Sequence, residues 1–181
     1  FIAVESKRIA AMLGWGIIGC GMIAKFHAKA IGEMRGSKLV ACYSRDMAKA
    51  AEFCDNYGGL PYDNLAAMLN DPLLDIVTIC TPSGAHLEPG LAAARAGKHV
   101  LVEKPLEVTV KRCDQLIAEC DKQGVYLGTI FPSRFHRSAL LMKSAVEQGR
   151  FGSISIADAI VKWFRTQQYY DSGKWRGTWA L

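Results

Sequence analysis

The sequence contains no apolar run that approaches the ~20 residues needed for a membrane-spanning helix. Residues 1–13 carry Glu5, Lys7 and Arg8 and lack the continuous apolar centre of a secretory signal. We therefore expect no membrane partner, and we expect residues 1–13 to form an irregular or weakly helical N-terminal extension. Because the first residue is Phe, we also expect the 181 residues to be part of a longer gene product.

Cysteine pairs with metal-ligand spacing are also missing. The six cysteines form no Cys-x-x-Cys pair, and no histidine lies near them at the spacing of a metal site. They stand at positions 20, 42, 54, 80, 113 and 120. This pattern predicts reduced, mostly buried thiols, no metal site and a cytoplasmic protein.

Basic runs are absent as well, although the net charge is +5. Lys and Arg are scattered along the chain without the interleaved aromatic residues of a protein that binds single-stranded nucleic acid. We therefore expect no nucleic-acid partner, whereas an anionic dinucleotide is compatible with the charge. Half of the residues are apolar and 22% are charged, which suits a globular protein with one complete core and part of a second.

Strand-like and helix-like segments alternate along the chain, with short turns between them. This order is typical of βαβ units and predicts an α/β fold with a doubly wound parallel sheet. Right-handed crossovers place the carboxyl ends of the strands along one edge, where ligands bind. The predicted strands are 15–19, 38–43, 75–80, 98–103 and 125–129, and the predicted helices are 22–35, 46–57, 63–70, 84–96 and 109–123.

The end of the first predicted strand carries a Gly-x-Gly turn that leads into a helix. Gly19 permits a tight turn, Gly21 lets the main chain approach a pyrophosphate, and Ala24 lets the helix pack closely on the strand. The helix start at Met22 and Ile23 offers unpaired N–H groups to phosphates. The pattern predicts a dinucleotide site, although an ordinary strand-to-helix turn remains an alternative.

The second strand end bears on the choice of cofactor. Ser44 and Arg45 stand where an acidic residue would bind the ribose of NAD, and a hydroxyl and a guanidinium suit a 2′-phosphate. This favours NADP, with NAD possible. Asp46 is either a ribose ligand or the cap of the next helix.

The third strand end carries Thr81, Pro82 and His86, in a loop predicted to pass under the bound cofactor. Pro82 fixes φ, and Ser83 is a candidate cap for the helix that begins near residue 85. His86 either contacts the ligand or pairs with nearby main chain, and the sequence leaves both alternatives open.

The fourth strand end carries Glu103 and Lys104, followed by Pro105. At this edge the two side chains can hold each other and the cofactor ribose, and the amine can bind or deprotonate a hydroxyl that is being oxidised. A solvent-exposed Glu–Lys pair is the alternative.

These motifs together resemble the Gfo/Idh/MocA family of NAD(P)-dependent oxidoreductases over about residues 14–181. The resemblance implies a Rossmann domain at 14–130, then at 131–181 the beginning of an α+β antiparallel-sheet domain for substrate binding and oligomerisation. It further implies that Lys104 positions substrate and handles its proton, that Glu103 binds the cofactor ribose, that the 104–105 peptide is cis, and that His86 lies near the cofactor.

In the second part, we predict a helix bearing Leu141, Met142, Ala145 and Val146, and a strand at 153–163. Segments 162–171 and 175–179 resemble family members that oxidise nucleotide-linked amino sugars. Arg and aromatic side chains suit anionic or polyhydroxylated substrates, but they also often only pack or face solvent. The candidate substrate contacts are Arg134, Arg165 and Tyr170.

We therefore predict an enzyme that moves a hydride between a sugar or nucleotide-sugar hydroxyl carbon and nicotinamide. The alternatives are an NAD-dependent glycosidase of the same fold and a non-catalytic dinucleotide-binding regulator, while a methyltransferase fits less well. The resemblance implies a homo-oligomer, and a catalytic Asp or Asn and a His beyond Leu181. We accordingly expect residues 1–181 alone to bind NADP weakly and to show little turnover.

Overall fold

The computed structural model describes residues 12–173, 176 and 177. Contacts within the chain divide it into two units, residues 1–130 and 131–181. The predicted extension at residues 1–13 lies almost wholly outside the described residues. Its last residue, Leu13, begins the first strand.

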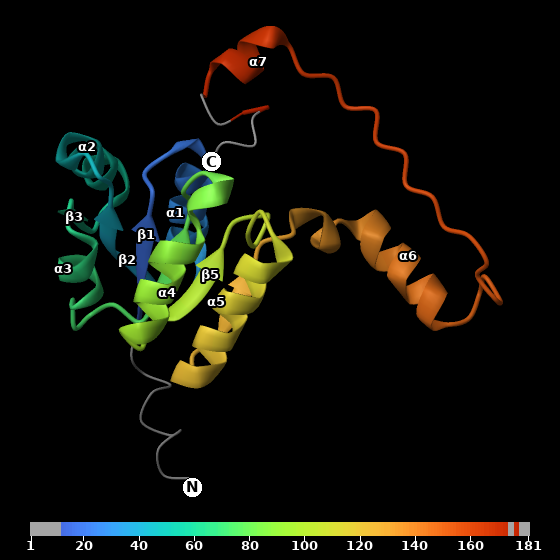
Figure 1. Cartoon of the computed structure of the whole chain (residues 1–181), viewed down its shortest axis with the longest axis horizontal. Helices are drawn as coiled ribbons and strands as arrows, with labels where there is room; N and C mark the ends of the chain where they lie inside the picture. Colours follow the sequence, from blue (N-terminus) through green and yellow to red (C-terminus); the bar gives the residue numbers. More distant parts are fainter. Residues whose placement is uncertain (1–11, 174–175, 178–181) are drawn as a thin grey trace, which may run out of the picture. The chain divides into compact units, whose positions relative to one another are not determined.

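The first unit contains one six-stranded parallel sheet with the order β3-β2-β1-β4-β5-β6 (Figure 1). This confirms the predicted doubly wound α/β fold. The five predicted strands are all present, with ends that differ by at most two residues. The strands are β1 (Leu13–Ile18), β2 (Ser37–Tyr43), β3 (Leu60–Tyr62), β4 (Ile76–Ile79), β5 (His99–Val102) and β6 (Leu127–Thr129).

Strand β3 is the one strand of this sheet that the sequence pattern did not predict. It has three residues, which is too short to show an alternating pattern, and its central residue is Pro61. Proline lacks the N–H that a central strand needs, but β3 lies at the edge of the sheet, where this donor is not required.

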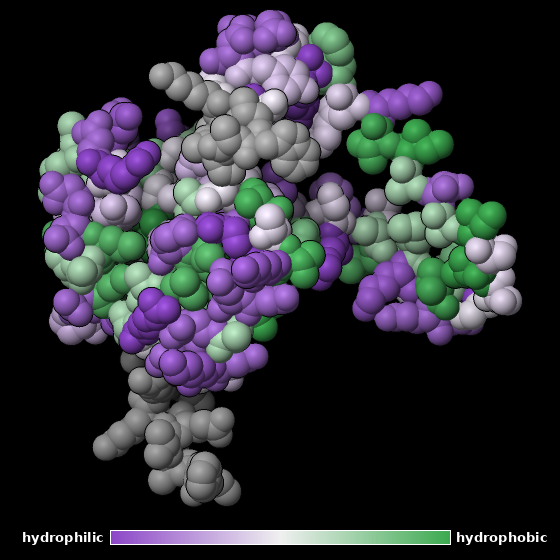
Figure 2. All heavy atoms as spheres, in the orientation of Figure 1, coloured by the Kyte–Doolittle hydropathy of each residue, from purple (hydrophilic) through white to green (hydrophobic). Residues whose placement is uncertain are grey.

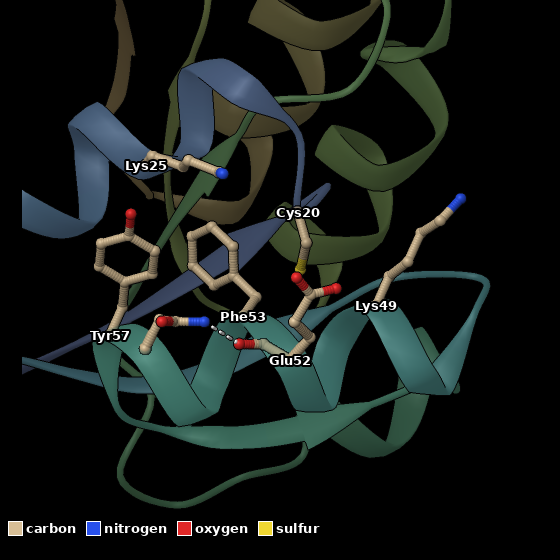
Figure 3. A pocket seen from close by; sticks show the side chains of 7 residues that line it. Cys20, Lys25, Lys49, Glu52, Phe53 and Tyr57 are labelled. Carbon is tan, nitrogen blue, oxygen red and sulfur yellow. Dashed lines mark hydrogen bonds between the residues drawn. The ribbon is translucent and has the colours of Figure 1, made fainter.

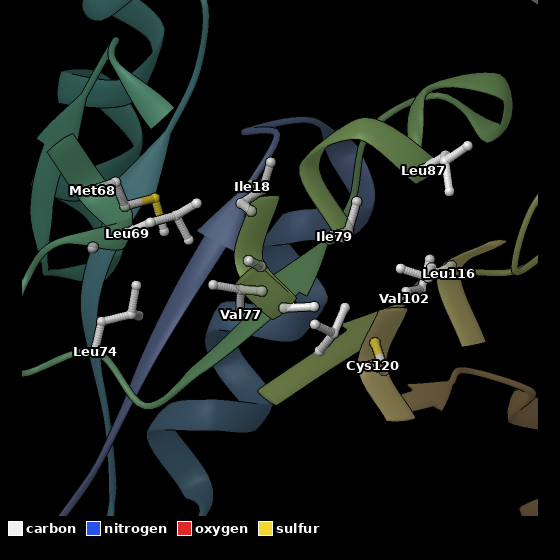
Figure 4. Packing of buried hydrophobic residues seen from close by; sticks show 14 residues of the cluster. Ile18, Met68, Leu69, Leu74, Val77, Ile79, Leu87, Val102, Leu116 and Cys120 are labelled. Carbon is white, nitrogen blue, oxygen red and sulfur yellow. The ribbon is translucent and has the colours of Figure 1, made fainter. Parts of the chain in front are cut away.

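Helices cover both faces of the sheet, so neighbouring residues of one strand are buried on opposite sides. Ile17 belongs to a cluster with side chains of α1 and α2. Ile18 belongs to the cluster with side chains of α3, α4 and α5 that Figure 4 shows. Both are fully buried, and burial of each such side chain contributes about 1.5–3 kcal/mol. The helices are α1 (Met22–Glu33), α2 (Met47–Tyr57), α3 (Leu65–Leu69), α4 (Leu87–Arg95) and α5 (Val110–Gln123).

Side-chain caps explain where three of these helices begin. The side-chain oxygens of Asp46, Asn64 and Thr109 accept main-chain N–H groups in the first turns of α2, α3 and α5. Helix α5 ends at Gly124, whose left-handed φ of 66° suits glycine. These local signals account for the close agreement between the predicted and observed helices.

All six cysteines are free, and four of them are buried. This confirms the prediction of reduced, mostly buried thiols. Burial raises the pKa of the Cys80 thiol to about 12, so this thiol stays protonated at neutral pH. Among the described residues, no group of three His, Cys, Asp or Glu side chains could hold a metal ion. No helix in this part of the chain is long and apolar enough to cross a membrane.

The second unit contains a short 3₁₀ turn, η2 (Pro132–Phe135), and the helices α6 (Arg137–Glu147) and α7 (Gln167–Asp171). Helix α6 confirms the predicted helix around residues 141–146. It has no buried residue, and Leu140, Leu141 and Met142 are exposed. Figure 2 shows apolar surface in the region where Figure 1 draws α6.

The predicted strand at 153–163 is wrong. These residues form neither strand nor helix in the structure, and all of them are exposed. An alternating sequence shows which side of a strand would be apolar, but a strand also needs a neighbouring strand for its main-chain hydrogen bonds. Within the described part of the second unit there is no strand, so the predicted antiparallel sheet is not present there. Helix α7 was not predicted.

Candidate functional site

Main-chain hydrogen bonds join the carboxyl ends of four strands of the sheet, β2, β1, β4 and β5. Gly19 N–H donates to Tyr43 O (2.9 Å), Cys80 N–H donates to Ile18 O (2.8 Å), and Glu103 N–H donates to Ile79 O (3.0 Å). Because the strands are parallel, all four of these ends lie at the carboxyl edge of the sheet. The structure therefore brings together the four strand ends on which the first-unit site residues were predicted.

The turn after β1 needs glycine at its first position and leaves space at its third. Gly19 has φ of 97°, and a Cβ there would lie 3.0 Å from main-chain atoms of Cys80 and Thr81. A Cβ on Gly21 would meet nothing within 4 Å. Gly21 begins α1 without a side-chain cap, so the N–H groups at Met22 and Ile23 have no capping oxygen. This geometry fits a phosphate group, and the contact itself remains a prediction.

At the end of β2, Asp46 is the cap of α2, one of its two predicted roles. Its Oδ1 accepts Ala48 N–H at 3.0 Å, and its Oδ2 lies 3.7 Å from Lys49 Nζ. Ser44 Oγ accepts Asp46 N–H at 3.2 Å, whereas Arg45 is exposed. This strand end thus presents a hydroxyl, a guanidinium and the half-exposed carboxylate of Asp46.

The ring of His86 lies between the loops that follow β4 and β5. Its Nε2 is 3.0 Å from Thr81 O, and its Nδ1 is 2.9 Å from Pro105 O. The residue is only 1% exposed. The structure thus shows the main-chain pairing that was one of the two alternatives. Both partners are carbonyl oxygens, which accept hydrogen bonds, whereas a neutral imidazole has a single N–H to donate.

The predicted cap at Ser83 is wrong. Ser83 lies within a short 3₁₀ helix, η1 (Ser83–Ala85), and α4 begins after His86 without a cap from its own side chains. Its first N–H groups are instead accepted by Glu107 Oε1, at 3.2 Å from His86 N and 3.0 Å from Leu87 N. A cap that comes from 20 residues away leaves no local sequence signal.

Glu107 is itself held by Arg112, whose Nε lies 2.9 Å from Oε2. Burial alone would raise the pKa of the Glu107 carboxyl, but the hydrogen bonds from Arg112 and from the N–H groups of Val108 and Leu87 outweigh it and lower the pKa. Arg112 also contacts Glu88 at 3.1 Å. Sequence reasoning missed this cluster, which ties the loop after β5 to the start of α4.

At the end of β5, Glu103 is buried and uses both carboxylate oxygens within the protein. Oε1 lies 3.0 Å from His27 Nε2, and Oε2 accepts the main-chain N–H of Lys104 at 3.0 Å. The predicted contact between the two side chains is therefore replaced by one from the carboxylate to the Lys104 main chain. Lys104 is exposed, and within residues 12–173 its ammonium group has no ion pair. The 104–105 peptide is cis, as the resemblance implied.

The three predicted substrate contacts belong to the second unit. The guanidinium of Arg134 lies 4.6 Å from the ring centre of Phe131, and that of Arg165 lies 4.1 Å from the ring centre of Trp163. Tyr170 packs edge-on against Tyr169. These are contacts within the unit, so the roles of Arg134, Arg165 and Tyr170 in substrate binding remain predictions. Of segment 175–179, residues 175, 178 and 179 lie outside the described residues.

A surface pocket of about 430 Å³ opens between α1 and α2 (Figure 3). Lys25 and Lys49 lie on its two sides, and Cys20 is its one residue from a strand-end loop. Burial raises the pKa of the Cys20 thiol to about 11, and nearby Cys54 adds to this rise. Cys20 is the middle residue of the glycine turn, but Gly19, Gly21 and Lys104 are not among the lining residues, so we do not assign the whole cofactor to this pocket. The lining residues are Cys20, Lys25, Lys49, Glu52, Phe53, Asn56 and Tyr57.

Comparisons with known proteins agree with this geometry. A family model described as an oxidoreductase family with an NAD-binding Rossmann fold, GFO_IDH_MocA, matches residues 13–131. The chain is 34% identical over 141 residues to 1,5-anhydro-D-fructose reductase of Ensifer adhaerens, covering 76% of this chain and 42% of that protein. It is 33% identical over 138 residues to myo-inositol 2-dehydrogenase of Thermotoga maritima, covering 76% and 41%. The chain thus spans less than half the length of these curated relatives.

Solved structures show the same similarity. The WlbA dehydrogenase from Bordetella pertussis, in complex with NADH and UDP-GlcNAcA, matches with a TM-score of 0.88 and 34% identity, over 93% of this chain and 51% of that one. KijD10, a 3-ketoreductase from Actinomadura kijaniata in complex with NADP, matches with a TM-score of 0.70 and 30% identity, over 76% and 44%.

Proposed function

The chain belongs to the Gfo/Idh/MocA oxidoreductase family, and from this membership we propose that the protein transfers a hydride between a sugar or nucleotide-sugar hydroxyl carbon and NAD(P). The observation that carries the proposal is the joined carboxyl edge of the sheet. There, Gly21 follows β1 in an open turn at the start of α1, and the exposed Lys104 follows β5. Both strands pair with β4, so the two residues lie on either side of one strand.

The residues of this edge fit a dinucleotide. Gly21 leaves open space beside the uncapped first N–H groups of α1, which suits a pyrophosphate. Ser44 and Arg45 at the next strand end suit a 2′-phosphate, and Asp46 is already engaged as a helix cap. These observations support NADP as the preferred cofactor, with NAD as the alternative.

Lys104 is the proposed catalytic residue. Its ammonium group can donate a hydrogen bond that orients the substrate hydroxyl, and its neutral amine can accept the hydroxyl proton during oxidation. The bound nicotinamide supplies the hydride acceptor, or the donor in the reverse direction. The Glu103 carboxylate accepts the main-chain N–H of Lys104. The main chain that carries the Lys104 amine is therefore held in place.

The sugar-type substrate class is supported by the relatives, which are named as sugar and polyol dehydrogenases and reductases, and by the UDP-GlcNAcA bound to WlbA. Within the second unit, Arg134, Arg165 and Tyr170 are the proposed substrate contacts. We further propose a homo-oligomer. Six free thiols support a reducing compartment such as the cytoplasm.

The test is cofactor reduction with a panel of sugars and nucleotide sugars by the whole protein that carries these residues, because residues 1–181 alone are expected to show little turnover; the native protein is compared with Lys104→Ala. Loss of the lysine is expected to lower kcat by about 10²- to 10⁴-fold, the usual contribution of a general acid or base. Lys122→Ala, an exposed lysine at the end of α5, is the matched control and is expected to leave kcat unchanged.

Three outcomes would contradict the proposal. Release of a glycone without net reduction of the cofactor would indicate a glycosidase of the same fold. Cofactor binding with no turnover, and a biological output unaffected by Lys104→Ala, would indicate a regulator. Equal kcat values for the native protein and Lys104→Ala would remove the lysine from the mechanism.

A further inference from the structure

A series of hydrogen-bonded polar side chains leads from the interior of the sheet to the main chain of Lys104. Thr78 in β4 is fully buried, and its Oγ1 lies 2.8 Å from His27 Nδ1 in α1. His27 Nε2 lies 3.0 Å from Glu103 Oε1 at the end of β5, and the side chains of His27 and Glu103 are 11% and 8% exposed. Glu103 Oε2 then accepts the main-chain N–H of Lys104. Four contacting groups thus connect the centre of the sheet to the proposed catalytic lysine.

The chemistry of these groups fixes the direction of each hydrogen bond. A carboxylate accepts hydrogen bonds and donates none, so the His27 Nε2–H donates to Glu103. In the neutral ring the Nδ1 is then an acceptor, and the Thr78 hydroxyl donates to it. Cys80 Sγ lies 4.0 Å from Thr78 Oγ1, and its protonated thiol can complete the chain as a weak donor. Each polar group therefore has a partner when His27 is neutral with its proton on Nε2.

We propose that His27 is a positioning residue that acts through Glu103 to hold Lys104 in its productive place. The inference rests on the proposed function for the role of Lys104, but the contacts that carry it are independent of any ligand. Glu103 Oε2 accepts the N–H of the next residue, Lys104. Among the described residues, His27 is the one side chain within hydrogen-bond distance of the other carboxylate oxygen, Oε1. Without this donor, nothing polar fixes the rotamer of Glu103 on that side.

The consequence for the reaction is geometric. A shift of about 1 Å in a catalytic group can lower the rate by about 100-fold, even when the altered residue does not touch the substrate. A change at His27 is therefore expected to act on kcat through the position of Lys104. The predicted phosphate contacts at Gly21 and Arg45 are not part of these contacts, so we expect a larger effect on kcat than on the cofactor KM, which changes only through the ribose contact implied for Glu103.

Two substitutions of similar size separate the contact with Glu103 from the contact with Thr78. In His27→Gln the terminal amide reaches about as far as Nε2 and can still donate to Glu103. In His27→Asn the amide reaches only about as far as Nδ1, so it can contact Thr78 but stops short of the carboxylate. We expect His27→Asn to lower kcat by up to about 100-fold and His27→Gln to restore most of it. Thermal unfolding of both variants controls for loss of fold.

A second measurement needs neither substrate nor cofactor. Hydrogen exchange at the Lys104 main-chain amide, followed by NMR, reports whether Glu103 still accepts this N–H. Loss of a hydrogen bond to a charged group raises the equilibrium constant for local opening by about tenfold or more. The exchange rate is therefore expected to rise by that factor in His27→Asn and to stay at the native value in His27→Gln.

These measurements separate the inference from the proposed function. Native exchange at Lys104 in His27→Asn, or equal kcat values for His27→Asn and native protein, would overturn the positioning role. Equal impairment of both variants would also overturn it, because the donor to Glu103 would then not matter. If the native protein reduces no cofactor with any sugar, the proposed function fails, and the amide measurement alone decides whether His27 positions Lys104.

Discussion

His86 and Pro105 are joined across the carboxyl edge of the sheet, with ring Nδ1 2.9 Å from the main-chain oxygen. The same ring contacts Thr81 O through Nε2, so one buried side chain holds the loop after β4 to the loop after β5. His86, for which the sequence left two roles open, is thus a buried residue that connects two loops of the proposed site. Its removal should affect both loops at once.

We expect His86→Leu to lower the free energy of unfolding by about 1–3 kcal/mol, because a buried carbonyl oxygen then loses its hydrogen-bond donor. Urea unfolding would measure the change. His136→Leu, at an exposed histidine before α6, is the control and should change stability by less than about 0.5 kcal/mol. A small effect at His86 would mean that water or another group replaces the ring.

The two glycines of the first turn should respond differently to alanine. Gly19→Ala places a Cβ against the main chain at a φ of 97°, and we expect a loss of about 1–3 kcal/mol in stability. Gly21→Ala meets open space, so stability should change by less than about 1 kcal/mol while NADP affinity falls by about tenfold or more. Calorimetric binding and thermal unfolding together would show this separation, and native affinity in Gly21→Ala would place the phosphates elsewhere.

Arg45→Asp should reverse the cofactor preference. Removal of a guanidinium from a 2′-phosphate is expected to weaken NADP binding by about 10- to 100-fold, while NAD binding is retained or improved. Affinities for both dinucleotides would be measured in parallel. Arg35→Asp is the matched control, because Arg35 is exposed just before β2, at the opposite end of that strand. An unchanged preference in Arg45→Asp would show that the β2 end does not select the cofactor.

Glu107 should stabilise the protein in a pH-dependent way. Its pKa is lowered in the folded state, so its contribution is present above the unfolded-state value and is lost as pH falls through the folded-state value. Glu107→Gln is expected to cost about 1–3 kcal/mol near pH 7, and the difference from native protein should shrink below about pH 4. Urea unfolding at several pH values would measure it, with exposed Glu33→Gln as the control. A constant difference across pH would contradict the carboxylate role.

The parallel sheet was predictable because its central strands are short apolar runs that end in recognisable turns. Strand β1 followed by Gly19 and strand β5 followed by Glu103 gave both the fold and the edge at which to look for a site. In contrast, the strand predicted at 153–163 depended on a partner that a sequence pattern does not supply. β3 was missed because its sequence does not look like a strand: Pro61 disfavours one, but pairing with β2 at the edge of the sheet tolerates it.

The contacts that organise the site were mostly hidden in the sequence. Glu107 caps a helix that begins 20 residues earlier, and His27 meets a carboxylate 76 residues away. The one available signal was polarity in apolar surroundings, since Thr78 interrupts an apolar strand and the residues one turn from His27 on α1, Ile23 and Ile31, are apolar. Such residues mark buried polar partners, but their partners become known only when the chain is folded.

The free thiols lie on both faces of the sheet, so their reactivity can report when the helices on each face separate from it. Cys42 and Cys54 belong to the cluster beneath α1 and α2, whereas Cys120 belongs to the cluster on the other face of the sheet. Alkylation of a buried thiol requires the surrounding helices to separate, so the labelling rate at each position reports the opening of its own layer. Mass spectrometry of the modified peptides could therefore show whether the two helical layers detach together or one before the other.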